Sequence, residues 1–287
     1  MLMWFALIPL AQAVSPPPDG GYPGGNTAEG ENALLRLSSG TYNTAVGLFS
    51  LLSNTTGSFN TALGAGTLLA NTGDNNTAVG AGALLSNDVN SDNTGIGAFA
   101  LFSNLGGANT AIGAHALLSN YAGGDNTAIG EEALVNNTNG GANTAIGKNA
   151  LFNNTEGIGN TAVGIAALFS NTTGTFNIAL GDGAGDGVTT ASHVICLGAV
   201  GNDVDNSCYI GNIYGAEISK NAAFVLVDAD GKVGTGAVDA NGNSVTLVSP
   251  QAMLDELHKQ ENRVTELEAA VRQQQKQIDA LTAGLQK

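Results

Sequence analysis

Residues 143–154 read NTAIGKNALFNN, and variants of this stretch recur along more than half of the 287-residue chain. The Asn that opens each unit returns at intervals of 16 or 17 residues. Self-similarity at a fixed short period indicates a repeat architecture, in which each unit buries its apolar side chains against the next unit. The opening residues are Asn26, Asn43, Asn60, Asn76, Asn93, Asn109, Asn126, Asn143, Asn160 and Asn177.

Other positions of the unit keep their register with this Asn. A Gly stands four residues after every opening Asn, from Gly30 to Gly181, and a Leu stands eight residues after the first nine, from Leu34 to Leu168. A second Asn stands eleven residues after, from Asn54 to Asn171. The two short intervals lose one residue after this second Asn. That segment is therefore predicted to be a tolerant surface turn, rich in Gly, Thr, Asn and Asp.

The apolar pieces of the unit are too short, and too often interrupted by Gly, for amphipathic helices. The Thr-Ala-Val-Gly piece predicts a short strand, in which Thr44 and Val46 share one face and Ala45 lies on the other. The Ala-Leu-Leu-Ser piece fits either a second strand or a single helical turn. We therefore predict an all-β parallel β-roll or solenoid of 16–17-residue repeats over residues 26–187.

Such a stack would align identical side chains from unit to unit. Aliphatic residues would stack on aliphatic residues, and the Asn columns would form ladders of side-chain amides. The unbroken Gly column indicates either a positive φ or the close approach of another backbone.

The repeated Asn-Thr-Ala-(Val/Ile)-Gly with a following Ala-Leu resembles the YadA-like head repeats of trimeric autotransporter adhesins. It is most similar to the Asn-Thr-Ala-Ile-Gly variety of bacterial surface and tail-fibre-like proteins. The resemblance covers about residues 26–187 and implies a left-handed parallel β-roll in which three chains associate. Two features depart from the family: the unit is longer, and Thr stands where those heads usually have Val.

Residues 188–248 lose the period but keep traces of it. Residues 194–198 and 208–211 end like the apolar-Gly step of the unit, which predicts two degenerate coils. Residues 225–227 and 244–248 are strand-like. The dipeptides Asp230-Gly231 and Asn241-Gly242 between them are typical of hairpin turns, so we expect a small β cap.

Residues 249–287 predict a long helix, with Ser249 as its cap and Pro250 at its first position. An apolar stripe of such length needs a partner, so we expect a self-associating coiled-coil stalk, in which Arg263 and Glu268 can pair between helices. The a and d residues fit two strands, whereas the family resemblance implies three. A single helix folded back on the roll is the alternative. The a positions are Leu257, Val264, Val271, Ile278 and Leu285, and the d positions are Met253, Gln260, Leu267, Gln274 and Leu281.

Residues 1–13 form an apolar run that ends in Ala11-Gln12-Ala13, the pattern of a signal-peptidase site. We therefore expect a signal peptide at 1–13, with an ordinary N-terminal tail as the alternative. Residues 14–25 hold four of the six prolines and predict a Pro/Gly linker. The remaining sequence predicts no membrane span. The expected location is secreted or on the bacterial cell surface.

Composition and charge argue against several functional classes. Only 11% of the residues are charged and the net charge is −15, which disfavours nucleic acid as a partner. The histidines His115, His193 and His258 are scattered, and the pair Glu131-Glu132 occupies variable repeat positions typical of a solvated face. We predict no catalytic, cofactor-binding or metal-binding residues, no cofactor and no enzymatic activity.

Three further candidates receive structural interpretations. Aligning Gly198 with Gly211 places Cys208 opposite Ile195, which disfavours a disulfide between Cys196 and Cys208. Residues 181–187, a Gly/Asp run, predict a flexible exit from the roll rather than a phosphate or calcium loop. Residues 228–231 lack the Glu that closes a calcium loop, and a hairpin turn is expected there.

The favoured hypothesis is an exported bacterial structural or adhesive protein, with a homotrimeric β-roll head on a coiled-coil stalk. Its partners would be other copies of itself and a host or matrix surface protein or glycan. The alternative is a phage-tail-fibre-like or appendage shaft with an assembly role. An ice- or crystal-binding face built on the Thr column, and a polysaccharide-active enzyme, are weaker candidates.

Overall fold

The computed structural model describes residues 22–211, four two-residue strands between residues 226 and 245, and a helix over 250–285. Within that helix, side chains are described from residue 256 to residue 278. The chain divides into two compact units, Met1–Gly215 and Ala216–Lys287. The predicted signal peptide at 1–13 and the first eight residues of the predicted linker lie outside the described residues.

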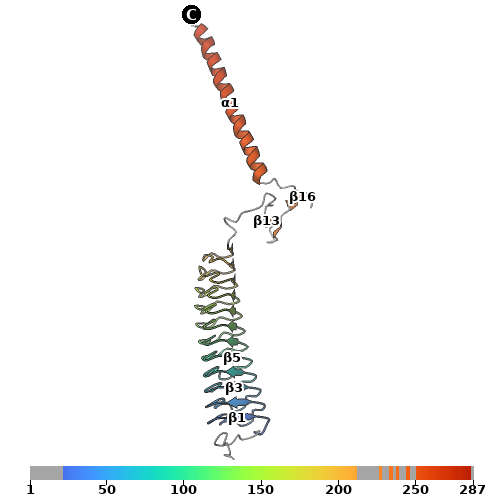
Figure 1. Cartoon of the computed structure of the whole chain (residues 1–287), viewed down its shortest axis with the longest axis vertical. Coiled ribbons are helices and arrows are strands. Elements are labelled where there is room, and N and C mark those ends of the chain that lie inside the picture. The colour runs from blue at the N-terminus through green and yellow to red at the C-terminus, as the bar shows by residue number, and fades with distance from the viewer. Residues whose placement is uncertain are drawn as a thin grey trace, which may run out of the picture. The chain divides into compact units, whose positions relative to one another are not determined.

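The first unit is a parallel β-solenoid, as the repeat predicted. Twelve three-residue strands form one sheet, in which each strand pairs with the next one along the chain (Figure 1). The strands are β1 (Thr27–Glu29), β2 (Thr44–Val46), β3 (Thr61–Leu63), β4 (Thr77–Val79), β5 (Thr94–Ile96), β6 (Thr110–Ile112), β7 (Thr127–Ile129), β8 (Thr144–Ile146), β9 (Thr161–Val163), β10 (Ile178–Leu180), β11 (Ile195–Leu197) and β12 (Cys208–Ile210).

Equivalent residues of successive repeats lie opposite each other in the sheet. Thr44 pairs with Thr61 and Ala45 with Ala62, and this register holds along the stack. The strand Thr N–H donates to the carbonyl of the next coil's opening Asn, and Thr44 to Asn60 is one example, at 2.8 Å. Neighbouring coils are therefore about 4.8 Å apart, the spacing of hydrogen-bonded strands.

The core of the solenoid is narrow, and its apolar part consists mainly of Ala and Leu side chains. The middle residue of most strands is a buried Ala, such as Ala45 or Ala145, while its neighbours point outward. The remaining volume is filled by the Leu eight residues after each opening Asn. Burying one such Leu contributes about 2 kcal/mol. The Leu column consists of Leu34, Leu51, Leu68, Leu84, Leu101, Leu117, Leu134, Leu151 and Leu168.

The Ala-Leu-Leu-Ser piece is neither a strand nor a helical turn. It forms an irregular turn in which the buried Leu has a left-handed backbone, with φ of 50° at Leu51. The N–H of Leu51 donates to the carbonyl of Thr67 in the next coil at 3.0 Å. With this left-handed φ, the Leu side chain points into the core and the Leu N–H points towards the next coil.

The Gly column has both properties that the sequence indicated. Gly130 has a φ of +135°, and a Cβ placed on it would lie 2.6 Å from the carbonyl carbon and oxygen of Gly147. Real Cβ atoms do not approach backbone so closely, so this position requires Gly on two independent grounds.

The predicted amide ladders are also present, and both Asn columns are buried. The backbone N–H of Asn143 donates to Oδ1 of Asn126 at 3.0 Å, and Nδ2 of Asn143 donates to the carbonyl of Gly157 at 2.8 Å. In the second column, Nδ2 of Asn137 donates to Oδ1 of Asn120 at 2.7 Å. Such bonds satisfy the polar groups that the narrow core would otherwise leave unpaired.

The solenoid extends beyond both predicted boundaries. Residues 22–25 belong to its first coil, since Nδ2 of Asn26 donates to the carbonyl of Pro23 at 2.7 Å. The predicted flexible exit at 181–187 was wrong, because these residues form a turn of the regular kind and β11 and β12 continue the sheet. The prediction of two degenerate coils was correct.

The second unit contains two short antiparallel ladders and a helix. Strand β13 (Leu226–Val227) pairs with β14 (Val233–Gly234), and β15 (Ala237–Val238) pairs with β16 (Ser244–Val245). The predicted turn dipeptides Asp230-Gly231 and Asn241-Gly242 lie outside the described residues. The rest of the predicted hairpin turn at residues 228–231 also lies outside them. Helix α1 (Pro250–Leu285) begins at the predicted proline.

Candidate functional site

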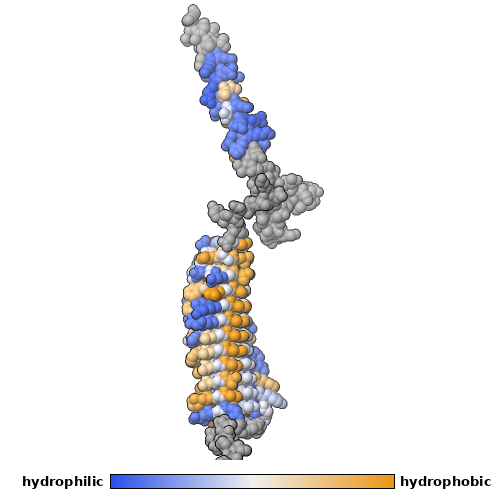
Figure 2. All heavy atoms as spheres, in the orientation of Figure 1, coloured by the Kyte–Doolittle hydropathy of each residue, from blue (hydrophilic) through white to orange (hydrophobic). Residues whose placement is uncertain are grey.

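The outward face of the 12-stranded sheet carries two columns of side chains. The first residue of β1 to β9 is Thr, and the third residue of β2 to β12 is Val, Ile or Leu. We call this surface the sheet face, and we call the third residues of β2 to β12, from Val46 to Ile210, its aliphatic column. Figure 2 shows a hydrophobic stripe that runs down the long axis of the solenoid, across its strands.

The aliphatic column is substantially exposed. Eight of its members have 37–54% of their surface accessible, and Val46, Val79 and Val163 are half-buried. Continuous apolar patches of this kind mark interaction surfaces in soluble proteins. The sheet face is thus the main candidate site of the solenoid. The eight exposed members are Leu63, Ile96, Ile112, Ile129, Ile146, Leu180, Leu197 and Ile210.

The sheet face becomes more apolar towards β12. There the Thr column is continued by Ile178 and Ile195, which are both exposed. The last member is Cys208, which lies opposite Ile195 in the sheet as the sequence alignment predicted. Cys208 is therefore an exposed free thiol on the sheet face, whereas Cys196 is buried and also free. Burial raises the pKa of the Cys196 thiol.

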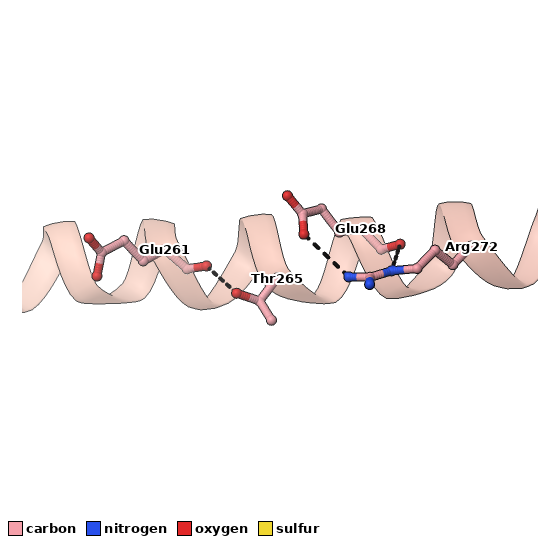
Figure 3. A network of polar contacts seen from close by, with 4 residues as sticks. All are labelled: Glu261, Thr265, Glu268 and Arg272. Carbon is pink, nitrogen blue, oxygen red and sulfur yellow. Dashed lines mark hydrogen bonds and ion pairs between the residues drawn. The ribbon is translucent and has the colours of Figure 1, made fainter.

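Helix α1 carries a second exposed apolar stripe. Leu257, Val264, Leu267, Val271 and Ile278 are 54–64% exposed and follow the predicted heptad. On the polar side, Nη2 of Arg272 lies 3.4 Å from Oε2 of Glu268 (Figure 3). Glu268, which was predicted to pair with Arg263 of another helix, thus has a partner one turn away in its own helix.

The side chain of Asp203 closes the end of the solenoid, and the sequence did not predict this role. In a regular coil the turn N–H groups bind a carbonyl of the next coil, as Thr138 and Asn139 bind Thr155. In the last turn, Oδ1 of Asp203 replaces this carbonyl and accepts the N–H groups of Thr189, Thr190 and Ala191 at 2.7–2.8 Å.

Asp203 also accepts the hydroxyls of Thr189 and Thr190 through Oδ2, at 2.6 and 3.0 Å. Desolvation raises the pKa of Asp203, but these hydrogen bonds outweigh it and hold the pKa well below its usual range. Asp203 acts as a structural cap. Only the shortened final repeat could have indicated it in the sequence.

The remaining candidates from the sequence lie apart from one another. The ring of His115 stacks on Phe99 at 5.7 Å, His193 lies over Phe176 at 5.3 Å, and His258 is exposed on α1. Oε2 of Glu131 forms an exposed ion pair with Nζ of Lys148 at 2.8 Å, and this hydrogen bond and charge lower the pKa of Glu131.

Two findings concern the described residues as a set. No group of three or more His, Cys, Asp or Glu side chains among them is arranged to hold a metal ion. Their helix is not apolar enough over a sufficient length to cross a membrane.

Asp186, in the predicted exit loop, accepts the hydroxyl of Ser170 at 2.8 Å, so it supports the coil surface.

No protein-family model matches the chain, and no curated protein matches it.

Proposed function

We propose that this chain is an exported, non-catalytic bacterial surface protein with a structural and adhesive role, built as a self-associating rod. In this proposal three copies pack their sheet faces together and form a left-handed β-roll head. Their α1 helices wind into a coiled-coil stalk. The observation that carries the proposal is the exposed aliphatic column of the sheet face, which is continuous from Val46 to Ile210.

Several features support self-association over a different partner. The column repeats an aliphatic residue at a constant spacing of about 4.8 Å, so another copy offers a surface of matching length and chemistry. Closed symmetric oligomers are the usual outcome when one patch is complementary to itself or to its neighbour on an identical chain. The exposed heptad stripe of α1 has the same need for cover.

The export and adhesion parts of the proposal rest on sequence. The run at 1–13 has the pattern of a signal peptide, and the Asn-Thr-Ala-Ile-Gly units resemble YadA-like heads. A trimer would present three copies of every surface loop, which raises avidity without any strong single site.

The test is the mass of the purified full chain, measured by light scattering after gel filtration. We expect three times the chain mass of 28.7 kDa. The double variant Ile129→Lys with Ile146→Lys places two charges on the sheet face and should reduce the mass. Two lysines at the exposed turn positions Asn139 and Thr173 serve as the matched control and should leave it unchanged. A monomer in the wild-type sample would refute the proposal.

A further inference from the structure

A second surface of the solenoid forms a shallow polar groove of about 590 Å³. It runs across four successive coils, from the turn at residues 119–121 to the turn at 170–172. Its volume falls within the range of known ligand sites, about 300–1,000 Å³. The groove shares no residue with the sheet face, so a self-associated rod does not use these side chains for its interface.

Two rows of side chains line the groove, one on each side of the buried second Asn column. The first row precedes the column and consists of Ser119, Asn136, Asn153 and Ser170. The second row follows it and consists of Tyr121, Thr138, Thr155 and Thr172. Because the Asn between them is locked into the amide ladder, both rows are held by rigid backbone, which lowers the entropic cost of binding.

The rows differ in hydrogen-bonding capacity. Thr138, Thr155 and Thr172 each donate their hydroxyl hydrogen to a carbonyl of the next coil, at 2.8–3.1 Å, so their oxygens face the groove as acceptors. In the first row, Asn136 donates to the carbonyl of Phe152 and Ser170 to Asp186. The Asn153 amide and the Ser119 hydroxyl form no hydrogen bond with the described residues and offer both donors and acceptors. A ligand that carries many hydroxyl groups complements both rows.

Charge and aromatic content narrow the ligand class. None of the eight lining residues carries a charge at neutral pH, and the whole chain is acidic, which disfavours anionic chains. Tyr121, at one end of the groove, is 53% exposed and offers a rigid ring face with a polar tip. Pyranose rings pack their C–H faces on such rings.

The length of the groove fits an extended oligosaccharide. Four coils span roughly 14 Å at the strand spacing, and each coil supplies one polar pair. This advance per coil is close to the length of one pyranose unit in an extended chain. We infer that the groove between residues 119 and 172 binds a segment of a neutral polysaccharide, about three or four sugars long. The inference names the adhesive partner of the proposed function and rests on it in that respect.

The experiment titrates the full chain with neutral β-1,4-linked hexasaccharides (cellohexaose, mannohexaose and fully N-acetylated chitohexaose) by calorimetry. We expect at least one to bind, and Tyr121→Thr with Asn153→Ala to weaken that binding at least about tenfold. Thr and Ala already occupy these two repeat positions in other coils, at Thr72 and Ala70, so the variant should fold. Tyr42→Ala is the control, because Tyr42 is an exposed tyrosine outside the groove and Ala142 occupies its repeat position.

The molecular mass of the same samples is measured by light scattering, so that a failure of this inference can be distinguished from a failure of the proposed function. Binding that depends on Tyr121 and Asn153 in a monomeric chain would support the groove and refute only the trimer. A trimer that binds none of the hexasaccharides would overturn the groove. Equal binding by the variant, or tighter binding of a neutral Gly/Ser/Asn peptide, would also overturn it.

Discussion

Oδ1 of Asn126 accepts two hydrogen bonds from the next coil, one from the backbone N–H of Asn143 at 3.0 Å and one from its Nδ2 at 3.2 Å. The Oδ1 of Asn143 in turn accepts the N–H of Asn160 at 2.9 Å. Each opening Asn therefore links the coil before it to the coil after it, inside a core that water does not reach.

Replacing Asn143 by Ala should strongly destabilise the solenoid. The change leaves the buried N–H of Asn160 without its acceptor, which costs about 1–3 kcal/mol. It also removes one of the two amide donors to the carbonyl of Gly157, which keeps Nδ2 of Asn154 at 3.1 Å. We expect a loss of about 2–3 kcal/mol, measured by urea denaturation followed by circular dichroism. The control Asn136→Ala removes one exposed bond, to the carbonyl of Phe152, and should cost less than about 0.5 kcal/mol. Equal losses for both variants would contradict the role of the ladder.

Two Gly→Ala changes should differ sharply although both positions have positive φ. Gly130→Ala places a Cβ 2.6 Å from the backbone of Gly147, so we expect a loss of about 2–3 kcal/mol in unfolding free energy. Gly183→Ala meets no atom within 4 Å, and Ala166 holds the same repeat position with a φ of 53°. Its effect on the melting temperature should be small. Similar melting temperatures for the two variants would argue against close backbone contact in the Gly column.

The Asp203 cap should make the last coils sensitive to acid. Because its folded pKa lies below the unfolded value of about 3.9, its contribution is complete above that value and is lost as pH falls through the folded pKa. Asp203→Ala should speed hydrogen exchange at Thr189, Thr190 and Ala191 at pH 7. The difference from wild type should shrink at low pH. Asp182→Ala is the control, because this carboxylate is exposed and its side chain forms no hydrogen bond with the described residues.

The two thiols should react very differently. Cys208 is exposed in the single chain and Cys196 is buried with a raised pKa, so only Cys208 should be alkylated by iodoacetamide in the folded Ile129→Lys/Ile146→Lys variant, whose sheet face is not covered by other copies. Peptide mass spectrometry should find one modified cysteine per chain under native conditions and two in denaturant. Native modification of Cys196 would mean that the last coils open readily.

Charges on the apolar stripe of α1 should prevent helix association. We expect Val264→Asp with Val271→Asp to lower the helix content, because an exposed helix of this length is marginal without a partner. Thr265→Asp with Gln273→Asp adds the same charge on the polar side and should leave the helix content unchanged. The readout is circular dichroism over a concentration series, and an identical response from both variants would exclude pairing through the stripe.

Much of the fold could be predicted because the period fixes register. Once Asn43 and Asn60 are seen as equivalent, parallel pairing, amide ladders and the Gly contacts follow from stacking alone. The end of the solenoid was predicted less well, since β11 and β12 keep the register without the Asn-Thr-Ala pattern. The role of Asp203 depends on three backbone N–H groups that the shortened repeat brings together, and no motif signals it.

The conformation of Leu51 lay beyond sequence reasoning for a different reason. A left-handed φ is unusual for Leu, and local preference would favour a strand or a helical turn. Stacking of identical coils buries the Leu side chain, and this burial compensates for the strain. The conformation therefore depends on the neighbouring coils rather than on the local sequence. The candidate surfaces were missed for a similar reason, because the sequence pattern alone did not reveal that Ala, rather than Val or Ile, faces inward.

The junction between coils, a Thr N–H on the next Asn carbonyl at 2.8 Å, is the same wherever Thr opens a strand. A coil inserted by gene duplication would meet identical partners above and below it. The rod can therefore lengthen or shorten in evolution by unequal recombination, about 4.8 Å per copy, without redesign of its interior. The length of the solenoid is a heritable dimension that such a lineage can change one coil at a time.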